Sequence, residues 1–203
     1  MRIVLFAMSA AVPLGYLAGG RLGNLAKLRF RWPLAGAAGI GLQFVPAAGT
    51  VGTLLLVASF LFLLAAAGRN RRLPGFVLIL AGLWLNFLVI TVNEGMPVTR
   101  NALVASAQAD TLASMNSGTD PKHHLATGRD QLVFLADTIP IPPPVHQALS
   151  VGDLLAYSGA AWFVTGGMRR NAAVPDPPAG GLEPQPTDGR DPHQTELATA
   201  EAP

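Results

Sequence analysis

The chain has 203 residues, of which half are hydrophobic and only 13% are charged. Soluble domains carry about 25% charged residues, so this composition excludes an ordinary water-soluble globule and a highly charged disordered protein. The absence of cysteine excludes disulfides and thiolate metal sites, and the net charge of +2 gives no reason to expect a nucleic-acid partner.

Five apolar runs predict an all-α, polytopic membrane protein with about five transmembrane helices. A hydrocarbon core about 30 Å thick needs roughly 20 apolar residues in a helix. Four runs approach that length, whereas glycines dilute the second run, which we expect to lean on its neighbours. The first run also fits a signal peptide, but cleavage would send a basic segment across the membrane, so we expect a retained helix. The predicted spans are residues 3–20, 33–48, 51–67, 73–92 and 151–168.

Basic residues give the expected orientation of these helices. No Asp or Glu precedes Glu94, whereas Lys and Arg cluster in residues 21–32 and 68–72 and follow the last run at Arg169 and Arg170. Basic loops of membrane proteins face the cytoplasm. We therefore expect a multi-pass protein of the bacterial cell membrane, with its N-terminus outside and its C-terminus in the cytoplasm.

The longest connection, residues 93–150, is predicted to form an extracytoplasmic loop cap. Within it, residues 97–115 would place one apolar side of a helix on the membrane surface, formed by Val104, Ala107, Leu112 and Met115. A connection of this length is more than a turn, so we expect it to carry the function.

The C-terminal tail differs in composition from the rest of the chain. After Arg170 it is rich in proline and polar residues and has almost no large apolar side chain. Such a segment cannot bury enough surface to offset the entropy of ordering. We therefore predict two parts, a transmembrane helical domain at 1–170 and a disordered cytoplasmic tail at 171–203.

Asp137 and Asp153 are the candidates for chemistry, because a proline-rich segment between them could fold back and bring them together. Two facing carboxylates can share a proton, as acid–base catalysis requires. A carboxylate at the membrane boundary is also a candidate functional group. A structural role is equally open, since Ser150-x-x-Asp153 ahead of an apolar run is a capping-box pattern. Asp137 would then lie in an exposed turn.

Asn93, Gly95 and His123 are further binding candidates in the outer half of the chain. Gly95 also fits the left-handed cap that closes a helix before a proline. His123 adjoins His124, and adjacent residues do not share a helix face, so we expect no metal site. We expect no cofactor either. Asn86, inside the fourth run, is expected to form a hydrogen bond between helices.

Four segments follow one another along the chain: LWLNFLVITVNEGMPV at residues 83–98, the pair Lys122-His123, FLADTIPIP at 134–142 and LSVGDLL at 149–155. Their order and spacing resemble the DUF5317 family of bacterial membrane proteins. That family usually has glycine where this chain has Glu94 and Ala136. The resemblance implies the membrane class of the chain and no particular activity.

A shorter pattern is similar to the lipoprotein signal peptidase family, which has an Asn-x-Gly segment followed by two aspartates near the outer membrane face. Asn93, Gly95, Asp137 and Asp153 would correspond to it, although the arginine that flanks the first aspartate in that family is missing here.

Two functions therefore remain open, and whether the protein is an enzyme stays undecided. The first is a non-enzymatic binding or accessory protein that acts through residues 93–153. Its partners would be the lipid bilayer and a membrane or extracytoplasmic protein. The second is an intramembrane aspartic hydrolase that uses Asp137 and Asp153.

Overall fold

The computed structural model describes residues 2–47, 49–116 and 122–170, so the predicted tail at 171–203 lies outside the described residues. The described residues fall within one compact unit. The α-helices are α1 (Arg2–Leu17), α2 (Pro33–Leu42), α3 (Gly49–Arg69), α4 (Phe76–Asn93), α5 (Arg100–Ala105), α6 (Ala109–Asn116) and α7 (Val151–Arg169). The remaining elements are the 3-10 helices η1 (Leu22–Lys27) and η2 (Val133–Leu135) and the strands β1 (Met96–Val98), β2 (His123–Leu125), β3 (Ile139–Ile141) and β4 (Gln147–Leu149).

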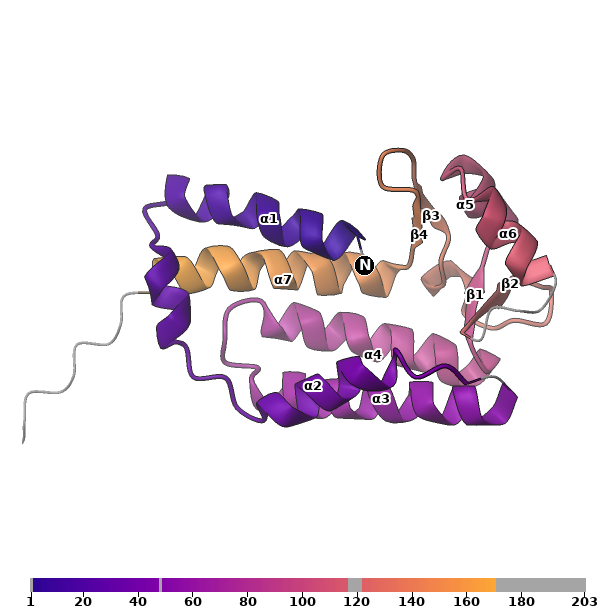
Figure 1. Cartoon of the computed structure of the whole chain (residues 1–203), viewed down its shortest axis with the longest axis horizontal. Helices are drawn as coiled ribbons and strands as arrows, with labels where there is room; N and C mark the ends of the chain where they lie inside the picture. Colours follow the sequence, from indigo (N-terminus) through magenta and orange to yellow (C-terminus); the bar gives the residue numbers. More distant parts are fainter. Residues whose placement is uncertain (1, 48, 117–121, 171–203) are drawn as a thin grey trace, which may run out of the picture. The chain divides into compact units, whose positions relative to one another are not determined.

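The long helices lie side by side in a row, with α7 between α1 and α4, and α3 between α4 and α2 (Figure 1). Glycines let α4 and α7 approach closely. A Cβ atom on Gly152 would lie 2.0 Å from Asn86 Oδ1, and one on Gly159 would lie 2.6 Å from the Gly75 carbonyl. Small residues at a helix interface allow such close backbone contact. The close contact therefore fixes α4 and α7 relative to each other.

A smaller layer, which we call the cap, is formed by residues 94–150 at one end of the long helices (Figure 1). Strand β1 pairs in parallel with β2, with Met96 opposite His123, and β3 pairs antiparallel with β4. The short strands correct the expectation of an all-α protein. Residues 139–145 carry prolines that remove helical N–H donors, and the first three of them pair as the extended strand β3 instead.

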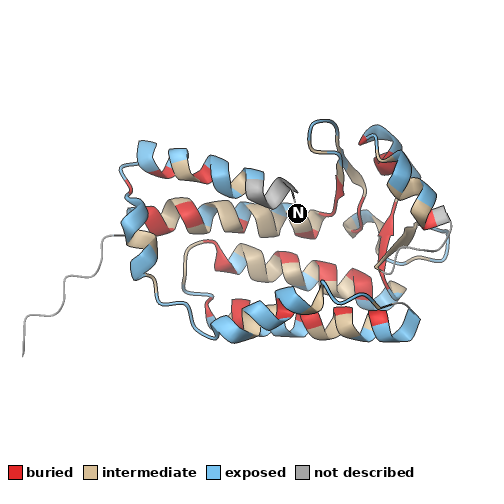
Figure 2. Ribbon diagram, in the orientation of Figure 1, coloured by how far each residue is buried: buried red, intermediate tan, exposed pale blue. Residues whose placement is uncertain are grey.

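Buried side chains join the cap to the bundle. Figure 2 shows buried residues on the sides of elements that face one another and exposed residues on the outer sides. One apolar cluster combines residues of α3 and α4 with residues of the cap, so the two layers share a core. Its buried members are Leu56, Phe60, Val89, Ile90, Met96 and Ala136.

The expectation of five transmembrane helices is wrong. In the described part of the chain, two helices are long and apolar enough to cross a bilayer, α3 with a mean hydropathy of 2.3 and α4 with 2.2. Helix α2 has 10 residues, about 15 Å, half of a hydrocarbon core of about 30 Å. Helix α1 is also too short, and α7 has the length but carries Asp153 and several glycines. The N-out, C-in orientation loses its basis with the five alternating spans.

The predicted single surface helix at 97–115 is also wrong. The segment forms two short helices, α5 and α6, and the backbone between them turns at Ala107, where φ is 55°. The turn places the expected stripe on different sides, because Val104 is 65% exposed whereas Met115 is buried in the cap.

Candidate functional site

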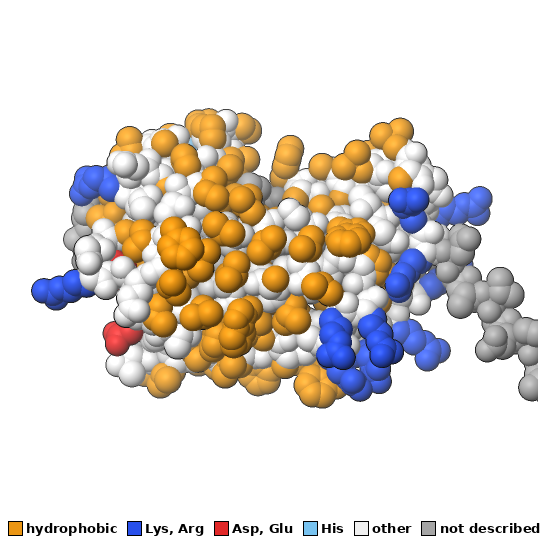
Figure 3. All heavy atoms as spheres, turned by 180° about the vertical axis from the view of Figure 1, so that it is seen from behind, with side chains coloured by type: hydrophobic (Ala, Val, Ile, Leu, Met, Phe, Trp, Pro, Cys, Tyr) orange, Lys and Arg blue, Asp and Glu red, His pale blue; other side chains and the backbone are white. Residues whose placement is uncertain are grey.

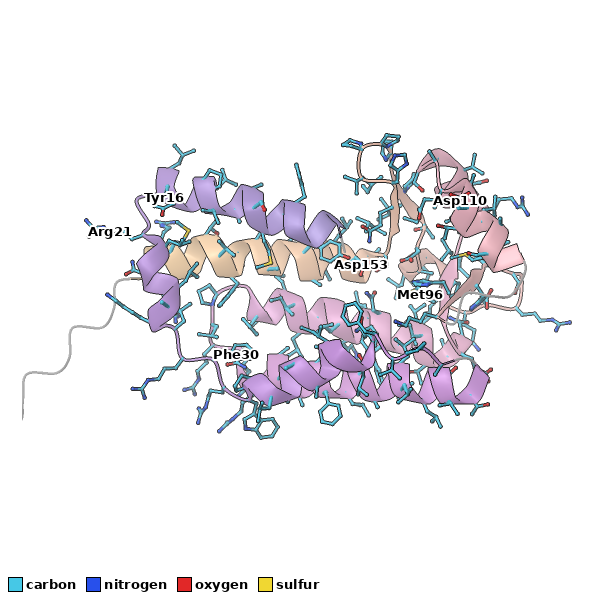
Figure 4. The ribbon with its side chains drawn as sticks, viewed as in Figure 1. Tyr16, Arg21, Phe30, Met96, Asp110 and Asp153 are labelled. Atoms are coloured by element: carbon cyan, nitrogen blue, oxygen red, sulfur yellow. The ribbon has the colours of Figure 1, made fainter. Side chains whose placement is uncertain are left out.

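A cavity of about 390 Å³ lies where the cap meets α3, α4 and α7. Figure 4 shows Asp153 at the end of α7 nearest the cap, with Met96 on the side of the cap. The lining is apolar along α3 and the end of α4, and in the cap it mixes apolar and polar side chains. Its polar members are Gln43, Asn86, Gln108, Thr111, Lys122, His123, Asp137, Gln147, Asp153 and Tyr157.

Asp153 is held by the first turn of α7 and by α4. Ser150 and Asp153 form the predicted capping box, which is confirmed: Asp153 N–H donates to Ser150 Oγ over 2.8 Å, and Ser150 N–H donates to the Asp153 carboxylate over 3.2 Å. The predicted interhelical role of Asn86 is confirmed as well. Its Nδ2 donates to Asp153 Oδ1 over 2.8 Å, and its Oδ1 accepts from Ser150 Oγ over 2.8 Å. Both Asp153 oxygens therefore accept a hydrogen bond.

Asp137 reaches the cavity through backbone pairing with β1. Its N–H donates to the Pro97 carbonyl over 3.1 Å, and its carbonyl accepts from Thr99 N–H over 3.1 Å. These bonds form a parallel bridge that adds Asp137 beside Val98. The residue is only 8% exposed, so the expectation of an exposed turn residue is wrong.

The Asp137 carboxyl lacks the partners that Asp153 has. Its Oδ1 is buried and accepts no hydrogen bond from any residue that the structure describes. Burial, together with the negative charge of Asp153, raises the pKa of Asp137 to about 7, although the charge of His123 acts in the opposite direction. A buried carboxyl in an apolar setting shifts in this way because its charged form loses hydration. The site therefore holds a group whose charge changes near neutral pH.

Lys122 and His123 bring the cationic groups of the lining. The Lys122 ammonium donates to the Gln43 carbonyl, which ties the cap to the segment after α2. His123 lies in β2 and acts electrostatically on Asp137. The neighbouring His124 faces another group, since its Nε2 lies 3.0 Å from Asp130 Oδ1. Although burial opposes it, hydrogen bonds from Thr127 and His124 hold the pKa of Asp130 below its usual value.

Asn93 and Gly95 are not among the described residues that line the cavity. The Asn93 amide bonds to the Val89 and Gln131 carbonyls, each over 2.9 Å, and accepts from Gln131 N–H over 2.8 Å. It therefore fastens the cap to the end of α4. The predicted left-handed helix cap lies one residue earlier than expected, at Glu94 with a φ of 55°.

The structure thus brings together His123, Asp137 and Asp153 of the five predicted site residues. Sequence reasoning did not select Lys122 or Tyr157 as site residues. Tyr157 follows Asp153 by one helical turn, a spacing that puts both side chains on one face of a helix, so the signal was present. Lys122 had the weaker signal of adjoining His123.

The donor set does not resemble a metal centre. Within the described residues, no group of three or more His, Cys, Asp or Glu side chains could hold a metal ion. The cavity instead combines an apolar wall with two carboxylates and several hydrogen-bonding groups. Such a lining suits a small organic molecule.

Comparison with known proteins matches residues 35–165, more than half of the chain, to a family of unknown function, DUF5317. The chain is also 32% identical over 147 residues to an uncharacterized protein of Thermotoga maritima, an alignment that covers 71% of this chain and 80% of that protein. No solved structure matches the chain. The family match covers the helices and cap residues that form the cavity, and it agrees with the resemblance found in the sequence. The chain therefore belongs to the DUF5317 family.

Proposed function

We propose that this protein is a multi-pass membrane protein that anchors in the bilayer through α3 and α4 and binds a small ligand in the cavity beneath its extracytoplasmic cap. The observation that carries the proposal is the cavity itself, in which a buried carboxyl group, Asp137, presents an oxygen without a hydrogen-bond partner among the described residues. Orphaned buried polar atoms are costly and are commonly satisfied by a bound molecule or ion.

The exposed apolar surface supports the bilayer anchor. Only 28% of the most apolar stretch of α3 and of α4 is buried within the protein, whereas a core helix of a soluble domain is mostly covered. Large side chains such as Leu54 and Val77 are 63% and 62% exposed. Figure 3 shows hydrophobic side chains across the middle of one face, with Lys and Arg confined to its ends. Continuous apolar surface of this kind suits lipid.

The charge on the α3–α4 turn supports an outer position for the cap. Arg69, Arg71 and Arg72 are exposed at this turn, and basic turns stay in the cytoplasm. The cap lies at the opposite ends of α3 and α4 (Figure 1), so a cytoplasmic turn would put the cap and its cavity outside. The bilayer is the proposed partner, and the expectation of a protein partner stays a prediction.

Single cysteines test this orientation cleanly, because the chain has none of its own. Thr111→Cys places a thiol in the cavity lining of the cap, and Arg71→Cys places one in the α3–α4 turn. A membrane-impermeant maleimide should label the cap cysteine in intact spheroplasts and the turn cysteine only after permeabilisation. The reverse pattern would overturn the outer position of the cap, and labelling of both without permeabilisation would overturn the bilayer anchor.

Aspartic hydrolysis is the second candidate, favoured by the raised pKa of Asp137 and its coupling to Asp153. The hydrogen bonds weigh against it. Both Asp153 oxygens already accept protein hydrogen bonds, and among the described residues none joins the two carboxyl groups. Proton sharing requires such a close contact.

Infrared titration of the carboxyl groups separates the two candidates. In Asp153→Asn, ligand binding predicts that Asp137 keeps most of its raised pKa, because burial is the largest cause. A proton-sharing pair predicts instead that the pKa of Asp137 falls back toward 3.8 when its partner carboxylate is removed. The second result would favour the hydrolase.

A further inference from the structure

We propose that the cavity binds an organic primary ammonium group carried on a short apolar chain, with Asp137 as its main acceptor and Asp153 as the second. The inference rests on the proposed ligand-binding function and names the chemical class of the ligand.

The first observation is the fixed, unsatisfied acceptor. Backbone bonds to Pro97 and Thr99 fix the main chain of Asp137 beside β1, and the residue is only 8% exposed. Its Oδ1 stays buried in the cavity lining with no bond from a described residue. A ligand N–H at hydrogen-bond distance would supply the missing donor, and a charged donor forms the stronger bond.

The second observation is that the cavity lining contains a second carboxylate. This carboxylate belongs to Asp153, and its Oδ1 and Oδ2 accept hydrogen bonds from Asn86 Nδ2 and Ser150 N–H, respectively. A carboxylate offers about four acceptor sites, so Asp153 keeps capacity for a ligand. The negative charge of Asp153 raises the pKa of Asp137, and a cation between the two groups would relieve this repulsion. An anionic ligand would add to it.

The cations of the lining do not replace such a ligand. The Lys122 ammonium donates to the Gln43 carbonyl on the segment after α2. The charge of His123 lowers the pKa of Asp137 but does not outweigh burial and Asp153 together. Charges of both signs therefore act on Asp137, and its Oδ1 still accepts no hydrogen bond from a described residue.

The apolar residues of the lining indicate the chemistry of the remainder of the ligand. Leu56, Phe60 and Ile90 line the cavity from α3 and α4, which suits a short alkyl chain. The rings of Phe60 and Tyr157 also line the cavity, and aromatic faces attract organic cations. A molecular cation is favoured over a metal ion, because the described residues offer no cluster of three metal-ligating side chains.

The test measures protection of a cavity thiol in the full-length, detergent-solubilised protein. Thr111→Cys is alkylated with and without n-butylammonium chloride, 1-butanol, or potassium chloride at matched ionic strength. We expect n-butylammonium to slow alkylation in a saturable way and the two controls to leave it nearly unchanged. Adding Asp137→Asn should raise the half-protective concentration about tenfold or more, the effect of one charge-assisted hydrogen bond. Asp110→Asn, on the exposed side of α6, is the matched control and should leave the half-protective concentration unchanged, with each variant compared to its own rate without ligand.

The outcomes distinguish the ammonium class, binding in the cavity and the role of Asp137. Equal protection by 1-butanol and n-butylammonium would overturn the ammonium class and leave ligand binding in the cavity standing. No protection by either probe at any concentration would overturn this inference together with the proposed binding function. Protection that survives Asp137→Asn would overturn the role of Asp137. The comparison of the two probes needs no change at Asp137, so it holds even if that variant folds poorly.

Discussion

Replacing Asp137 by asparagine should stabilise the folded protein above pH 7. The pKa of this carboxyl rises from 3.8 to about 7 on folding, with burial as the main cause. Between these values the folded state keeps a proton that the unfolded state has lost. The free energy of unfolding therefore falls as pH rises through this window and stays low above it.

The magnitude follows from the shift. About three pKa units at about 1.36 kcal/mol each give an upper limit of about 4 kcal/mol at pH 8. Between pH 5 and pH 8 the wild-type protein should lose about 2–3 kcal/mol through this group. The asparagine removes that loss. Its buried side-chain amide would, however, lack a hydrogen-bond partner at the position of Oδ1, which costs about 1–3 kcal/mol. We expect a net gain of about 1–3 kcal/mol at pH 8 and little gain at pH 5.

The assay is denaturant unfolding of the full-length protein in detergent micelles between pH 5 and pH 8. Lys122, His123, Asp153 and Tyr157 line the same cavity, and an imidazole titrates in the same range. His123→Gln is therefore measured alongside and should keep the decline. If Asp137→Asn shows the same loss of stability with pH as the wild type, the buried carboxyl is not its source and the reasoning fails.

Four further substitutions are measured by the same unfolding assay at one pH. Asn86→Ala removes two hydrogen bonds to the start of α7, one of them buried, and should cost about 1–3 kcal/mol; a change near zero would mean that water replaces both. Gly152→Ala places a Cβ 2.0 Å from the Asn86 amide oxygen and should cost about 1–3 kcal/mol, whereas Gly68→Ala, which meets open space, should be neutral or gain up to about 1 kcal/mol. Glu94→Gly should gain about 1 kcal/mol because φ is 55° there, and a loss would show that the Glu94 side chain has a stabilising contact.

Local patterns of the sequence predicted the local features of the site. Ser150-x-x-Asp153 ahead of an apolar run predicted the capping box, and Asn86 within an apolar run predicted a bond between helices. Both depend on spacing within one turn of helix or on the cost of burying an amide. Both features are therefore predictable from the sequence.

The number of spans was not predictable from apolar runs alone. Composition does not show where a helix ends: α2 ends at Leu42 although Phe44 and Val45 continue the apolar run. Helix α7 has the length of a span, but Asp153 and several glycines lower its hydropathy, and Gly152 and Gly159 pack against α4. The burial of Asp137 was equally hidden, because it depends on pairing with Val98, which lies far away in the chain.

Asp137 and Asp153 looked alike in the sequence, and their surroundings make them different groups. Asp153 has a structural role, since it caps the first turn of α7 and bonds to Asn86 of α4. Asp137 instead has one carboxyl oxygen, Oδ1, that accepts no hydrogen bond from a described residue, and its burial weakens the fold whenever it is charged. Side chains that lower stability are retained mainly where function needs them. The asymmetry between a satisfied and an orphaned carboxyl argues for a ligand beside Asp137 more strongly than for a proton shared between the pair.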